Sequence, residues 1–120
     1  MDISFILSAD EIFTLISLMP GQTEAGGRFV KNALPGAAMC DLSGLAEKKL
    51  ARMVDGEMIL TPAVRMVVDA ITRADSAEYN DNAWDIRSPW ISLRCESYPY
   101  LDSHWKITPL KGEQENENPG

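Results

Sequence analysis

The fold is decided by residues 42–75, which read LSGLAEKKLARMVDGEMILTPAVRMVVDAITRAD. Apolar residues in the first part recur at the spacing of one helical face, and Asp55-Gly56 then provides a left-handed stop. Residues 58–60 are compatible with a short strand. Thr61-Pro62 is typical of a helix start, because threonine caps free amide groups and proline suits the first helical position. The stretch therefore predicts a winged-helix-like helix–turn–strand–helix unit, and the alternative interpretation is a packed αβα core without a winged-helix function.

The segments before this unit predict a helical N-terminal part. The sequence Ser8-Ala9-Asp10-Glu11 is a capping box, and the apolar spacing behind it predicts a helix that ends at Pro20-Gly21. Apolar residues alternate over residues 3–7, which indicates a short leading strand or an extended arm. A second, short helix is expected within residues 24–34.

The segments after the unit predict a C-terminal antiparallel β-hairpin. Residues 78–87 are polar and suggest a loop, whereas residues 91–96 and 104–108 alternate as half-buried strands do. We therefore expect one α+β domain over residues 1–111, made of the helical part, the winged-helix-like unit and this hairpin. Residues 112–120 contain three glutamates and no apolar side chain apart from proline, so they predict a disordered acidic tail.

Composition limits the class of protein. The 120 residues carry a net charge of −7, and an acidic chain is poorly suited to neutralising phosphates, so nucleic-acid binding is not expected. The start MDISFILSADE does not resemble a secretory signal, and no apolar run approaches the ~20 residues needed to cross a bilayer. These features predict a cytoplasmic protein with no membrane contact. Two cysteines and one histidine cannot supply a four-ligand zinc site without carboxylates, and no cofactor is predicted.

No motif for catalysis stands out. A Cys95–His104–Asp102 nucleophile is conceivable, but the strand alternation turns Cys95 inward and His104 outward. The oxygen-rich residues 75–85 lack the order of a calcium loop and are interpreted as a solvated turn. Phosphate loops and dinucleotide glycine patterns are absent, and no small-molecule substrate is evident. The sequence therefore predicts a protein that is not an enzyme.

Aromatic residues gather in the C-terminal part. All tryptophans and tyrosines lie between residues 79 and 105: Tyr79, Trp84, Trp90, Tyr98, Tyr100 and Trp105. Exposed aromatic side chains are typical of protein-binding hot spots. We predict that a protein partner binds through Trp84, Trp90, Tyr98 and Tyr100. The competing interpretation is that a helix or the leading arm covers these side chains as part of the core.

Four short motifs together resemble a known family. They are Leu7-Ser8-Ala9-Asp10-Glu11, the spacing of Leu45, Lys49-Leu50 and Asp55-Gly56, then Leu60-Thr61-Pro62, and finally Ile107-Thr108-Pro109-Leu110. In this order they resemble the N-terminal half of the EspG-like, ESX secretion-associated proteins of type VII secretion, and small Firmicute relatives. The resemblance implies a cytosolic, non-enzymatic protein that holds a small helical secretion substrate or assembles with itself.

Three functional hypotheses follow from the sequence. The first is a protein-interaction module, in the role of a type VII secretion-associated chaperone or adaptor, with a protein partner or self-association. The second is a winged-helix-like regulator that binds nucleic acid through residues 42–75. The third is an enzyme of unrecognised type.

Overall fold

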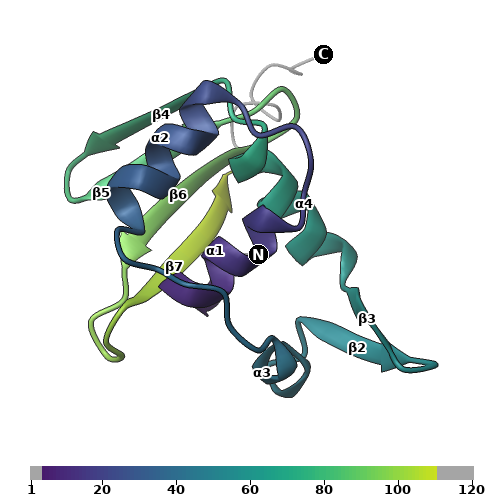
Figure 1. Cartoon of the computed structure of the whole chain (residues 1–120). Helices are drawn as coiled ribbons and strands as arrows, with labels where there is room; N and C mark the ends of the chain where they lie inside the picture. The colour runs from purple at the N-terminus through teal and green to yellow at the C-terminus, as the bar shows by residue number, and fades with distance from the viewer. Residues whose placement is uncertain (1–3, 111–120) are drawn as a thin grey trace, which may run out of the picture.

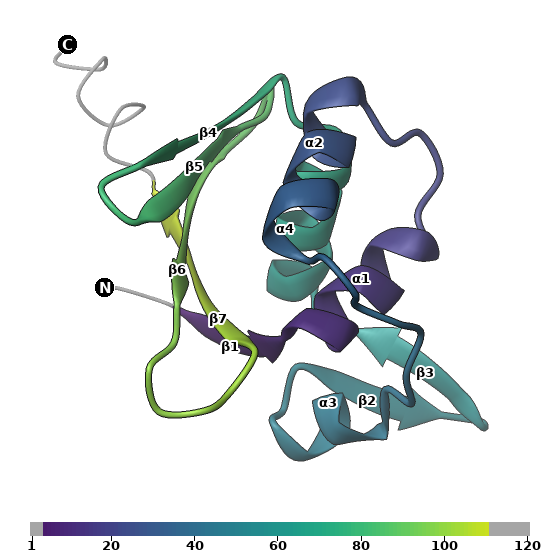
Figure 2. The same ribbon diagram turned by 60° about the vertical axis from the view of Figure 1, so that its left-hand side comes forward.

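The computed structural model describes residues 4–110, which form a five-stranded antiparallel sheet, three helices on one of its faces and a separate β-hairpin (Figures 1 and 2). The elements in chain order are β1 (Phe5–Ser8), α1 (Ala9–Ser17), α2 (Glu24–Ala33), α3 (Ser43–Glu47), β2 (Ala51–Val54), β3 (Glu57–Leu60), α4 (Pro62–Thr72), β4 (Ser76–Asn80), β5 (Ala83–Arg87), β6 (Ser92–Ser97) and β7 (His104–Leu110). Figure 2 shows α1, α2 and α4 beside the sheet, with α3 and the β2–β3 hairpin below α1.

The sheet has one buried face and one polar face. Its strands run in the order β1-β7-β6-β5-β4, so the first strand of the chain pairs with the last. Ile107 lies between Phe5 and Cys95 in register, and all three side chains are buried under the helices. On the opposite face Arg94 pairs with Asp85 at 3.2 Å across β5 and β6. This alternation is the pattern expected of a sheet that is covered on one side only.

The N-terminal elements agree with their prediction. The capping box at α1 is formed, because the backbone amide of Glu11 donates to Ser8 Oγ at 3.0 Å and that of Ser8 donates to Glu11 Oε1 at 2.9 Å. The short leading strand (β1) and the short second helix (α2) are also confirmed. These elements are specified by local signals, namely caps, alternation and helical periodicity.

Helices α2 and α4 meet at an unusually close contact. The backbone amide of Thr23 donates to the carbonyl of Thr72 at 2.9 Å, and its hydroxyl donates to the carbonyl of Ala74 at 2.6 Å. The same hydroxyl accepts from the amide of Gly26 at 3.1 Å and so caps α2. One threonine thus satisfies amides at the start of one helix and carbonyls at the end of another, which would otherwise lack partners.

The predicted winged-helix-like unit is wrong, although its short strand at residues 58–60 and its helix from Pro62 are present as β3 and α4. The helix expected from residue 42 ends at Glu47, and the chain turns at Lys49, whose φ is +64°. Residues 51–54 then form a strand that pairs with residues 57–60, so Asp55-Gly56 is the turn of a β-hairpin and not a helix stop. Both turn residues have positive φ, +53° and +82°, as the favoured two-residue hairpin turn requires. The hypothesis of a winged-helix regulator therefore loses its structural basis.

The predicted C-terminal architecture also needs correction. The pairing of residues 92–97 with residues 104–110 is confirmed, but this hairpin belongs to a five-stranded sheet and does not stand alone. Residues 78–87, expected to be a loop, instead form most of β4 and β5, joined by a turn at Asp81-Asn82 with φ of +53° and +66°. The outward-facing side chains of these two strands are polar, so the sequence resembles that of a loop although alternate side chains are buried.

Two predictions fall partly or wholly beyond the described chain. The domain boundary at residue 111 and the acidic tail of residues 112–120 lie outside the described residues. Among residues 4–110, no helix has the length and apolar character needed to cross a membrane.

Candidate functional site

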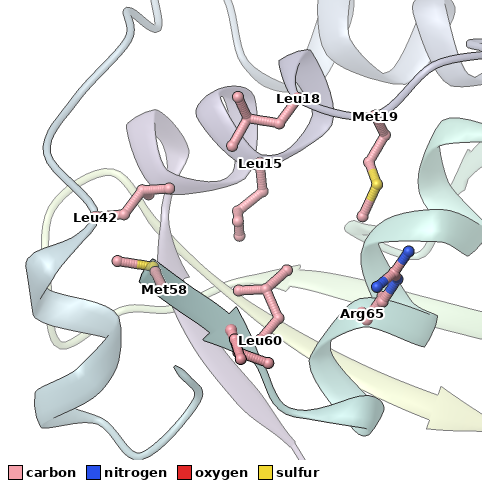
Figure 3. Close-up of a pocket in the computed structure, with 8 residues that line it drawn as sticks. Leu15, Leu18, Met19, Leu42, Met58, Leu60 and Arg65 are labelled. Atoms are coloured by element: carbon pink, nitrogen blue, oxygen red, sulfur yellow. The ribbon is translucent and has the colours of Figure 1, made fainter. Parts of the chain in front are cut away.

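An apolar groove of about 410 Å³ lies between α1, the β2–β3 hairpin and the start of α4 (Figure 3). We call it the α1–β3 groove. Its lining consists of seven apolar side chains and one cation, namely Leu15, Leu18, Met19, Leu42, Met58, Ile59, Leu60 and Arg65. A groove of this size and composition is suited to apolar side chains of a ligand or partner.

Each side of the groove comes from a different part of the chain. Leu15 projects from α1 and is buried, whereas Leu18 caps the same helix with 63% of its surface exposed. Strand β3 provides the opposite side, and there Ile59 is 43% exposed. Figure 3 shows Leu15 and Leu60 facing each other across the groove, with Arg65 at one end. Large apolar side chains exposed beside one another mark interaction surfaces.

Hydrogen bonds to α1 hold the walls in place. The segment before α3 is bound to α1 because the amide of Ala38 donates to Asp10 Oδ1 at 3.0 Å and that of Cys40 donates to Thr14 Oγ1 at 2.9 Å. After α3, Lys48 Nζ donates to Glu11 Oε1 at 2.9 Å. The hairpin therefore keeps a defined position relative to α1 although it lies outside the main sheet.

The Glu11–Lys48 pair is partly shielded from water. Burial raises the pKa of Glu11, but the hydrogen bond from Lys48, the backbone hydrogen bond from Ser8 and the positive charge of Lys48 outweigh it. The pKa of Glu11 is consequently lowered from its ordinary value of 4.5. A carboxyl whose pKa is lower in the folded state stabilises the fold fully above its unfolded-state pKa, and this stabilisation is lost as the pH falls through the folded value.

Replacing Glu11 by glutamine should lower the free energy of unfolding by about 1.5 kcal/mol at pH 7, since the charged hydrogen bond to Lys48 is lost. At a pH below the folded pKa the wild type also lacks this charge, so the two proteins should converge. Urea unfolding at a series of pH values measures the difference. Glu24→Gln, an exposed acid in the first turn of α2, is the control and should change stability by less than about 0.5 kcal/mol. A Glu11→Gln difference that is constant with pH would show that the ion pair does not contribute.

The predicted aromatic surface is divided among three places. Trp84 lies in β5 with only 8% of its surface exposed, and its ring meets that of Phe29 edge-on at 5.5 Å. Tyr98 and Tyr100 contact each other at 5.3 Å in the β6–β7 connection, where Tyr100 is 80% exposed. Trp90 lies in the β5–β6 connection, at the other end of β6. Trp84 therefore belongs to the core, and the four residues form no common surface.

A second cavity lies where α2 approaches the sheet. It has a volume of about 530 Å³ and is lined by Asn32, Ala33, Pro35, Tyr79, Trp84 and Trp105. The ring of Tyr79 meets that of Trp84 at 5.6 Å, and Tyr79 itself is 57% exposed. Among these lining residues, Trp84 is the one that the sequence predicts to bind a partner, and most of Trp84 faces the core.

The Cys95–His104–Asp102 arrangement is not formed. Cys95 is fully buried on the helix-covered face of the sheet, and burial together with the charge of Asp85 raises the pKa of its thiol far above the ordinary range. His104 lies on the other face, and its Nδ1 is 2.8 Å from the backbone carbonyl of Asp102. In the described part of the chain, no group of three His, Cys, Asp or Glu side chains is placed to hold a metal ion.

Sequence reasoning missed the α1–β3 groove. Its walls come from four segments that are separated in sequence, so no single motif encodes it. One signal was available, because Met58, Ile59 and Leu60 are consecutive apolar residues in a short strand. Since successive side chains of a strand point to opposite faces, such a run leaves an apolar residue on both faces of a two-stranded hairpin.

Comparison with known proteins gives no relative, because no family model, no curated protein and no solved structure matches the chain.

Proposed function

We propose that this protein is a non-enzymatic interaction module that binds a protein partner in the α1–β3 groove. The observation that carries the proposal is the exposed apolar lining, above all Leu18, which is 63% exposed. A partner that covers such side chains stabilises the complex by ~25 cal/mol for each Å² of apolar surface removed from water. The hairpin extends this surface with Met53, which is 56% exposed.

The composition of the groove supports binding and not catalysis. Seven of the eight lining side chains are apolar, so the groove offers no pair of groups for acid–base or nucleophilic chemistry. The resemblance to ESX secretion-associated proteins extends the proposal to a type VII secretion-associated chaperone or adaptor. This role accords with a groove that receives the apolar side chains of another chain.

The test uses helical peptides of about 16 residues, selected from a displayed library for binding to the intact protein. We expect Leu18→Gln to weaken the selected peptides at least about tenfold, since an anchoring leucine contributes ~1.5–3 kcal/mol when buried. Leu101→Gln is the matched control, because Leu101 is 51% exposed and lies outside the groove lining. Isothermal calorimetry gives the affinities, and thermal melting checks that both variants are folded.

Two outcomes would contradict the proposal. One is a library that yields no binder under conditions in which the protein is folded. The other is a set of binders whose affinity responds equally to Leu18→Gln and Leu101→Gln.

A further inference from the structure

Arg65 is the one charged side chain in the lining of the α1–β3 groove. Within residues 4–110 its guanidinium forms no hydrogen bond and no ion pair, although the protein carries 18 acidic residues against 11 basic ones. The residue is exposed at the end of the groove where α4 begins. What distinguishes Arg65 from the other exposed cations is its place in the groove lining, where its guanidinium can pair with an anion that a ligand brings beside its apolar groups.

The position of Arg65 in α4 does not explain its presence. Its backbone amide donates to the carbonyl of Thr61 at 3.0 Å, which closes the first turn of the helix. The N-terminal end of a helix carries partial positive charge, so a cation near it is unfavourable and an anion is favourable. An incoming carboxylate at this place is attracted by both the guanidinium and the helix.

We propose that the α1–β3 groove binds an amphipathic helix of a protein partner that carries a carboxylate beside its apolar anchors, and that Arg65 pairs with this carboxylate. The inference rests on the proposed function and specifies the partner's chemistry. Apolar side chains on one face of a helix enter the groove between Leu18 and Leu60, and an Asp or Glu on its flank reaches Arg65. Arginine suits this role because its planar fork holds a carboxylate through two parallel hydrogen bonds.

The tail of this chain does not have the required chemistry. Residues 111–120 contain Glu113, Glu115 and Glu117, but no aliphatic or aromatic side chain that would fill an apolar groove. The occupant must supply both an apolar face and a carboxylate, so we assign it to another polypeptide.

The experiment selects helical peptides of about 16 residues on the wild-type protein and on Arg65→Glu in parallel. We expect acidic residues beside the apolar anchors in the wild-type selection, and Lys or Arg at the same position in the Arg65→Glu selection. In the best wild-type peptide, changing that acid to Gln should weaken binding to the wild type by about tenfold. The same peptide change should have no effect on binding to Arg65→Met, which keeps the apolar stem and removes the charge.

Arg73→Met is the matched control. It removes the same charge from the C-cap of the same helix, outside the groove lining. The wild-type preference for the acidic peptide should persist in this variant, which separates a local ion pair from a general effect of net charge.

The outcomes separate this inference from the proposed function. Binders that depend on Leu18 but show no acidic preference would overturn the role of Arg65 and leave the proposed function standing. An absence of binders, or binders indifferent to Leu18, would overturn both. A protein that self-associates, with Leu18→Gln making it monomeric in sedimentation, would show that a second copy occupies the groove and would also overturn the inference.

Discussion

Replacing Gly26 by alanine should lower the free energy of unfolding by about 2 to 3 kcal/mol, because the added methyl group meets backbone atoms that cannot move aside. A Cβ at this position would lie 2.6 Å from the carbonyl oxygen of Ile71 and 2.7 Å from that of Thr72. Both carbonyls belong to the last turn of α4. Helix α2 would have to move away, which would lengthen the hydrogen bonds that Thr23 makes to Thr72 and Ala74.

The next residue provides a matched control in the same helix. A Cβ on Gly27 would lie 3.5 Å from the side-chain oxygen of Gln22, which is an ordinary contact with a flexible group. Since alanine favours a helix over glycine by up to ~1 kcal/mol, Gly27→Ala should leave the stability unchanged or raise it. Urea unfolding of both variants measures the two effects. Equal changes at the two positions would show that the close contact between α2 and α4 does not limit the packing.

Gly26 and Gly27 differ in a structural requirement that cannot be predicted from the sequence around them. Within the sequence, Gly26-Gly27 only weakens the expectation of a helix, because glycine is a poor helix former. The reason for a glycine at residue 26 is the approach of α4, whose nearest residues lie more than forty positions later in the chain. The need for a glycine at a contact between two distant segments produces no pattern in the local sequence.

The same distinction separates the elements that were predicted from those that were not. The capping box at Ser8 and the alternation in residues 91–96 are local signals, and the structure contains a helix and a strand at these places. Residues 42–54 carry apolar side chains at helical spacing, but short apolar runs fit a strand as well as a helix. Residues 51–54 form a strand because they pair with residues 57–60. Ala51, Arg52 and Met53 are all good helix formers, so tertiary pairing overrode their propensity.

The candidate site was harder to predict than the fold. The sequence shows that the tryptophans and tyrosines lie close together along the chain, but their exposure depends on which strand face each one occupies. Trp84 pairs with Cys95 in register, and this places it on the helix-covered face. The polar sequence of residues 78–87 predicts a loop, and a loop has no buried face to which the tryptophan could be assigned.

Replacing Trp84 by alanine should lower the free energy of unfolding by about 3 kcal/mol, because a large ring is removed from the core and a cavity remains. Its ring is 8% exposed and packs against Phe29 at 5.5 Å and Tyr79 at 5.6 Å. Tyr100→Ala is the comparison: its ring is 80% exposed, so the change in stability should stay below about 0.5 kcal/mol.

The pair of variants also tests where partners bind. If the α1–β3 groove is the binding surface, Tyr100→Ala should leave both stability and the affinity for groove-selected peptides unchanged. Trp84→Ala should weaken binding only at temperatures at which the variant begins to unfold, since Trp84 is absent from the groove lining. Melting curves and calorimetry on the same samples separate these effects. A fully folded Tyr100→Ala protein that loses peptide binding would return the site to the β6–β7 connection, as the aromatic pattern in the sequence first suggested.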